Sequence, residues 1–141
     1  MDEVQRTIDN LLQLVELLKE FPDEHFDTSR YLYHDKPGDV RMYAEFPSSI
    51  TPEEVNLSGA TTLCALGVAW LHGVGGSDAV TDESWIGYSS SVFPAVTASN
   101  GGAYDYRYGY QLWRQCFGDD SLDKADAIKR IVDAVKVLQE S

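Results

Sequence analysis

Cys64 and His72 are the cysteine and histidine that lie close together in the sequence, and a thiol enzyme needs such a pair within hydrogen-bonding reach. On a single helix they would lie about 12 Å apart along the axis, which is too far for direct proton transfer. Cys64 stands in an apolar stretch and Cys116 precedes Phe117, so we interpret both thiols as small core residues. Their spacing leaves a disulfide between them open.

The histidines and the glycine-rich segment do not match known ligand-binding motifs. A metal site built from His25, Asp27 and His34 has no known ligand spacing, so we expect surface histidines, no metal ion and no other cofactor. Residues 73–77 follow a predicted helix instead of a strand, and no lysine comes after them. Both features argue against a phosphate-binding or dinucleotide-binding loop, so we interpret this segment as a helix end and linker.

Four tyrosines alternate with other residues near position 107. As a strand, this segment would place all four on one face, and as a helix it would divide them into two pairs. Such rings offer a large contact area at low entropic cost, which is typical of a protein-binding surface. The alternative that half of them pack in the core stays open. They are Tyr104, Tyr106, Tyr108 and Tyr110.

Three segments carry helical patterns that would position these residues. Residues 3–20 and 122–139 have apolar side chains at helical spacing, and residues 61–72 are apolar on almost every side, which predicts a buried central helix around Trp70. We expect Asp120 or Ser121 to cap the last helix. The expected apolar positions of the outer helices are Val4, Ile8, Leu11, Leu12, Val15 and Leu18, then Ala125, Ile128, Ile131, Val132, Val135 and Leu138.

The remaining segments carry local sequence patterns that predict turns and short elements. Pro22 should end the first helix, residues 27–33 suggest a short helix, residues 36–39 a turn, and Thr51-Pro52-Glu53-Glu54 a helix start. Residues 77–102 form a long irregular insertion, and residues 103–117 are ambiguous between helix and strand. The sequence thus predicts one domain over residues 1–141, a mostly α small helical bundle with a long irregular insertion, and leaves open a short β-hairpin (α+β).

The charge of the chain is strongly negative. It has 23 acidic and 11 basic residues, a net charge of −12, and no lysine or arginine between Arg41 and Arg107. This balance argues against direct binding to nucleic acid or to an anionic membrane, and no apolar run reaches the roughly 20 residues that span a bilayer. An acidic N-terminus and only two cysteines make a cytoplasmic location the expectation.

Three stretches resemble a group of small proteins from bacteria and their phages. That group shows a Phe-Asp-x-Ser-x-Trp-type start, then a Cys-Gly-Thr-x-x-Cys-x-x-Gly helix, then a Leu-Phe-Gly near a final helix. The counterparts here are FDTSRY at 26–31, GATTLCALG at 59–67 and CFG at 116–118. Gly59 and Ala60 replace the first cysteine and the glycine of the pattern, so a paired-cysteine function does not carry over. The resemblance implies a phage or mobile-DNA setting.

These observations favour a non-enzymatic acidic inhibitor that binds and blocks a basic, nucleic-acid-handling protein, as phage anti-defence proteins (anti-CRISPR proteins among them) and toxin-immunity proteins do. A homodimer stays open. The alternative is a small enzyme with a site around Cys64, His72, Asp78, Asp82 and the loop of residues 73–102. The residues expected to contact a basic partner are Asp23, Glu24, Asp27, Asp35, Asp39, Glu45, Glu53, Glu54, Tyr104, Tyr106, Tyr108 and Tyr110.

Overall fold

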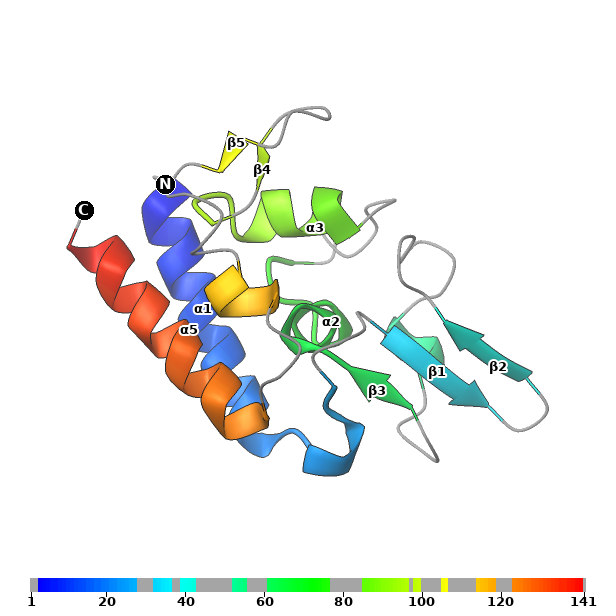
Figure 1. Cartoon of the computed structure of the whole chain (residues 1–141). Coiled ribbons are helices and arrows are strands. Elements are labelled where there is room, and N and C mark those ends of the chain that lie inside the picture. Colours follow the sequence, from blue (N-terminus) through cyan, green and yellow to red (C-terminus); the bar gives the residue numbers. More distant parts are fainter. Residues whose placement is uncertain are drawn as a thin grey trace.

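In the computed structural model, the described part of the chain is mostly helical, as the sequence predicts, and its buried apolar side chains form one core. Four longer helices enclose this core, while a small sheet lies at one end (Figure 1). The structure describes residues 3–27, 32–36, 39–42, 52–55, 61–76, 85–96, 98–99, 105–106, 114–118 and 123–140.

Short strands and helical turns separate the longer helices. The turns η1 and η3 are 3-10 helices, and η5 is a π-helical turn. The elements in chain order are α1 (Glu3–Glu20), η1 (Asp23–His25), β1 (Leu32–Lys36), β2 (Asp39–Met42), η3 (Pro52–Glu54), β3 (Thr62–Leu63), α2 (Ala65–Leu71), α3 (Trp85–Val92), β4 (Ala98–Ser99), β5 (Asp105–Tyr106), η5 (Arg114–Gly118) and α5 (Lys124–Gln139).

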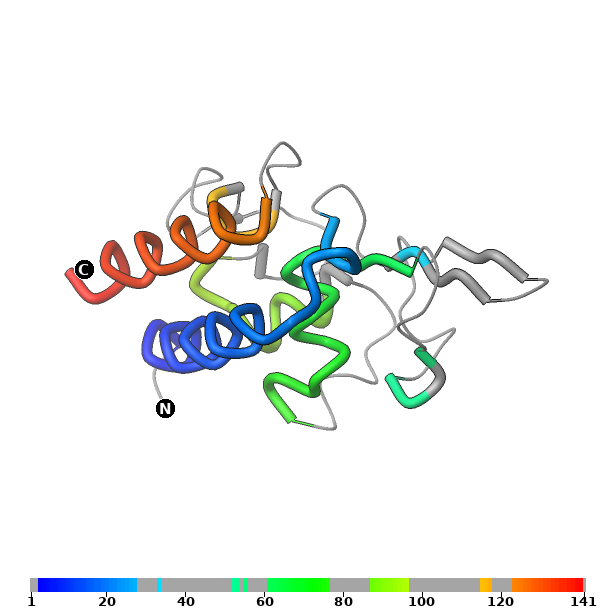
Figure 2. Tube along the Cα trace, turned by 90° about the horizontal axis from the view of Figure 1, so that it is seen from below, coloured from blue at the N-terminus to red at the C-terminus, as the bar shows by residue number. Residues whose placement is uncertain are grey.

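Helix α1 confirms the helix predicted over residues 3–20, and it ends before Pro22 as expected. It runs antiparallel to α5, beside which it lies in both views (Figures 1 and 2). The prediction that Leu12 points inward is wrong, since 43% of it is exposed, whereas Leu14 is buried. Leu12 is turned by about 100° from the buried Leu11, which places it beyond the edge of the buried stripe.

Helix α5 confirms the second amphipathic helix, although it begins at Lys124 instead of residue 122. Its cap is Asp123, whose carboxylate accepts a 2.8 Å hydrogen bond from the Asp126 backbone N–H, so the predicted cap at residue 120 or 121 is wrong. Ala125 is exposed, contrary to the predicted stripe, and Ala127 is buried in its place. At 100° per residue, Ala125 lies about 160° around the helix from Ala127, which places it on the opposite face.

Helix α2 confirms the buried central helix but spans only Ala65–Leu71, with Trp70 fully buried. The predicted helix began at residue 61, whereas the structure has strand β3 over Thr62–Leu63. Leu63 pairs with Leu32 of β1 and bridges Phe26, and its carbonyl accepts a 3.0 Å hydrogen bond from the Asp27 N–H. These pairings place the backbone of Leu63 in the sheet. The helix ends at the predicted place, where Gly73 has a φ of +70°.

The sheet has the order β2-β1-β3 with antiparallel neighbours, which confirms the β-hairpin that the sequence left open. Lys36 pairs with Asp39, so the two strands meet where residues 36–39 predict a turn. Leu32 and Tyr33 belong to β1, which contradicts the short helix expected over residues 27–33. The helix start expected at Thr51-Pro52 becomes only the three-residue turn η3.

Helix α3 lies within the segment predicted to be an irregular insertion, and this prediction is wrong there. Its C-terminal carbonyls are bound by side chains of α1: Asn10 donates a 2.8 Å hydrogen bond to Val92 O, and Arg6 donates one of 3.2 Å to Ser91 O. Its buried side chains include that of Ser89, so its buried face is not a purely apolar stripe. The ambiguous segment 103–117 contains both forms, strand β5 and the start of turn η5.

Candidate functional site

Both thiols lie in the core, as the sequence predicts. Cys64 and Cys116 are free cysteines with relative exposures of 2% and 3%, so the disulfide that the spacing left open is absent. Burial raises the pKa of the Cys64 thiol to about 11 and that of Cys116 to about 12. A thiolate is the reactive form of cysteine, and both side chains stay protonated at neutral pH. Neither is therefore an activated nucleophile.

Cys64 and His72 flank helix α2 at opposite ends, as its N-cap and C-cap residues. The helical rise places them about 12 Å apart, so the histidine is out of reach as a base for the thiol. Partial desolvation lowers the pKa of His72, which keeps its accessible ring neutral at pH 7. Asp78 and Asp82, the other residues of the enzyme alternative, lie outside the described residues.

His25 is buried, with 8% exposure, so its prediction as a surface histidine is wrong. Its Nδ1 lies 2.7 Å from the carbonyl oxygen of Thr61, which joins turn η1 to the residue before β3. This contact gives the ring a structural role. Among the described residues, no three histidine, cysteine or acidic side chains come together as a group that fits a metal ion.

Three acidic residues within five consecutive positions are exposed around the junction of α1 and η1, and we call Glu20, Asp23 and Glu24 the acidic corner. The local sequence explains why these side chains are exposed. Pro22, with a φ of −60° and a ψ of 129°, directs the chain out of α1 and into the 3-10 turn. Neighbouring acidic side chains therefore face solvent on a tight bend instead of spreading along a helix.

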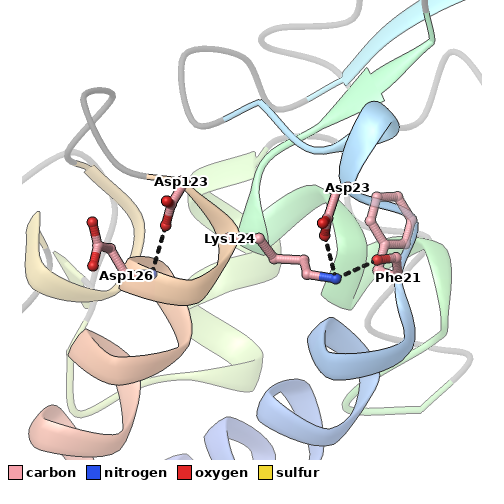
Figure 3. Close-up of polar contacts among 5 residues, drawn as sticks. All are labelled: Phe21, Asp23, Asp123, Lys124 and Asp126. Atoms are coloured by element: carbon pink, nitrogen blue, oxygen red, sulfur yellow. Dashed lines mark hydrogen bonds and ion pairs between the residues drawn. The ribbon is translucent and has the colours of Figure 1, made fainter.

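Lys124 approaches this corner from α5 (Figure 3). Its Nζ lies 2.6 Å from Asp23 Oδ1 and donates a 2.6 Å hydrogen bond to the carbonyl oxygen of Phe21. The lysine side chain is only 17% exposed, whereas that of Asp23 is 81% exposed. Lys124 thereby joins the start of α5 to the end of α1.

The other predicted contact residues are dispersed. Asp27 is half-buried after η1, and Glu53 is exposed on η3, where Glu54 also stands. Asp35 and Asp39 occupy the two strands of the hairpin. Sequence reasoning missed Glu20, which the helical repeat places on the exposed face of the last turn of α1. Tyr106 stands in β5, and the residues outside the described part are Glu45, Tyr104, Tyr108 and Tyr110.

Of the predicted contact residues that the structure describes, Asp23 and Glu24 are neighbours in the sequence and are both exposed. Helices of the length and apolarity needed to cross a membrane do not occur in the described part of the chain. Comparison with known proteins finds no matching family model, no similar curated protein and no similar solved structure.

Proposed function

We propose that this chain is a non-enzymatic acidic inhibitor, which binds and blocks a basic, nucleic-acid-handling protein. The observation that carries the proposal is the acidic corner, where Glu20, Asp23 and Glu24 are all exposed within five consecutive residues. Lys124 offsets the charge of Asp23 from a largely buried position, so the Asp23 carboxylate meets solvent far more than the lysine does. A setting in phage anti-defence or toxin immunity fits such an inhibitor.

Electrostatics explains why a nucleic-acid-handling partner suits this surface. Such a protein presents lysine and arginine side chains that neutralise phosphates, and exposed carboxylates are anions that these same side chains attract. A net charge of −12 also attracts the chain to a basic surface and speeds its association with a basic partner at low salt. Occupation of the basic site by the acidic corner would then exclude the nucleic acid.

The state of the thiols supports a binding role over the enzyme alternative. Cys64 is buried with a raised pKa, and its nearest histidine in sequence, His72, stands at the other end of α2. A thiol enzyme needs an accessible thiolate and a base within hydrogen-bonding reach. Cys64 is not an accessible thiolate, and His72 is not within hydrogen-bonding reach of it.

The test begins with immobilised chain and a nuclease-treated lysate of a bacterial host, followed by mass spectrometry of the captured proteins. The dissociation constant of the purified captured protein is then measured by calorimetry between about 50 and 500 mM salt, over which the Debye length falls severalfold. We expect a basic partner whose affinity falls steeply with salt. An affinity that does not change with salt contradicts the proposal.

Two charge-matched variants test the location of the surface. One carries Glu20→Gln and Glu24→Gln in the acidic corner, and the other carries Asp126→Asn and Glu140→Gln on α5; all four side chains are exposed. Each variant changes the net charge from −12 to about −10, so long-range attraction is nearly the same in both. We expect the corner variant to lose affinity about tenfold and the α5 variant to lose much less. Equal losses would place the contact elsewhere.

A further inference from the structure

Strand β2 is an edge strand of the three-stranded sheet. The strand order β2-β1-β3 places β1 on one side of it, and no other strand lies against it in the part of the chain that the structure describes. In Figure 1 the hairpin stands at the end of the molecule opposite α5, with β2 outermost. An edge strand presents backbone donors and acceptors that another strand can bind.

The hairpin register fixes which backbone groups of β2 point outwards. Lys36 and Asp39 pair across a loop of two residues, and residues that flank such a loop form a hydrogen-bonded pair. Hydrogen-bonded and non-hydrogen-bonded pairs alternate along antiparallel strands, so Asp39 and Arg41 direct their backbone groups towards β1. Val40 directs its N–H and C=O away from β1, towards the side of β2 on which the described part of the chain has no strand.

A second copy of the same strand complements this edge. In an antiparallel pair with its two-fold axis at Val40, the two Val40 residues exchange backbone hydrogen bonds. Asp39 of each copy then stands opposite Arg41 of the other, which gives two cross-strand pairs of opposite charge.

The neighbouring symmetric registers are unfavourable, which makes this pairing specific. An axis at Asp39 places two aspartates opposite each other, and an axis at Arg41 places two arginines opposite each other. Like charges directly opposite one another destabilise a strand pair. Among these three registers, only the axis at Val40 pairs unlike charges.

The local charge also permits two copies to approach at this place. Residues 32–42 contain two acidic and two basic residues, Asp35, Asp39, Lys36 and Arg41, although the chain as a whole carries a net charge of −12. Repulsion between two strongly acidic copies is therefore smaller at the hairpin than at the acidic corner. We propose that two copies of this chain form a symmetric dimer through β2, joined edge to edge about Val40.

Charge reversal at the edge tests this dimer by sedimentation equilibrium over a range of protein concentrations. Asp39→Arg and Arg41→Asp each turn both cross-strand pairs into like-charged pairs, so we expect each to raise the dimer dissociation constant about tenfold or more. The double variant restores opposite charges and should return to within about threefold of the unchanged protein. Asp35→Arg makes the same charge change as Asp39→Arg on the inner strand and should leave the dimer intact.

Val40→Pro provides a second test, because it removes an outward N–H without removing a hydrogen bond to β1. We expect it to abolish the dimer while far-UV circular dichroism keeps the helical signal of the core. A wild-type chain that is monomeric at all concentrations overturns the proposal. A dimer that survives Val40→Pro, or that Asp35→Arg and Asp39→Arg weaken equally, overturns it as well.

Discussion

The buried hydroxyl group of Thr7 binds two backbone groups, one of them in the segment after α3, so it tests how α1 holds the rest of the fold. Its Oγ1 donates a 2.8 Å hydrogen bond to Glu3 O and accepts one of 2.9 Å from the Ala95 N–H. Thr7 and Ala95 are both fully buried, so water cannot replace the hydroxyl. The bond to Ala95 joins the first turns of α1 to the segment after α3.

Thr7→Val keeps the shape of the side chain and leaves the buried Ala95 N–H without its acceptor. A buried donor without a partner costs about 1–3 kcal/mol, so we expect the free energy of unfolding to fall by this amount. Thr7→Ser is the matched control. It keeps the hydroxyl and removes one buried methyl group, at a cost of about 1 kcal/mol.

Urea unfolding measures both losses, and amide hydrogen exchange separates their causes. Thr7→Val should increase the exchange rate of the Ala95 amide far more than that of amides in the middle of α5, whereas Thr7→Ser should keep Ala95 protected. An Ala95 amide equally protected in both variants would show that the Thr7 hydroxyl does not hold this segment, and the reasoning would fail.

Two further predictions concern the turn after α2 and the core thiol. Gly75→Ala should destabilise the protein by about 2 kcal/mol or more, because its φ is +92° and an added methyl group would meet the side chain of Val92. Gly76→Ala is the control: its φ is +99° but the space around it is open, so it should cost about 1 kcal/mol. Thermal unfolding compares the two variants, and equal losses of stability would contradict the contact with Val92. Because burial raises the pKa of Cys64 from 9.0 to about 11, the unfolded thiol ionises first, so the free energy of unfolding should fall as the pH rises between these values. Cys64→Ala should make that fall shallower, and an unchanged pH profile would refute a buried protonated thiol.

The amphipathic helices were predictable because their stability depends on a periodic apolar face. Leu11, Val15 and Leu18 of α1 lie at positions that the 3.6-residue repeat alone identifies. Thr7 is also fully buried, yet a polar residue gives no sign of burial until its partner Ala95, far along the chain, is in place. The same limit explains β3, since Leu63 continues an apolar helical pattern and only pairing with β1 makes it a strand.

Helix α3 was missed for a related reason. It carries a tryptophan and a tyrosine among serines, and although Tyr88, Ser89 and Val92 are buried at helical spacing, the serine among them gives no sign of burial in the sequence. Contacts from outside stabilise it. Asn10 of α1 binds the carbonyl of Val92, and the Tyr88 hydroxyl donates a 2.9 Å hydrogen bond to Val74 O. A helix held by side chains from distant segments has little signature in its own sequence.

The candidate surface depends on where the bases lie, and this is what a count of acidic residues omits. Asp23 receives its counterion from Lys124 of α5, and Asp39 stands opposite Lys36 in the hairpin register. Both acids therefore have basic neighbours that reduce the local excess of negative charge. Glu20 and Glu24 are exposed at the bend after α1, so a partner attracted by charge should distinguish them from the hairpin acids. The two proposals consequently assign different surfaces: the bend to a basic protein, and the edge of β2 to a second copy.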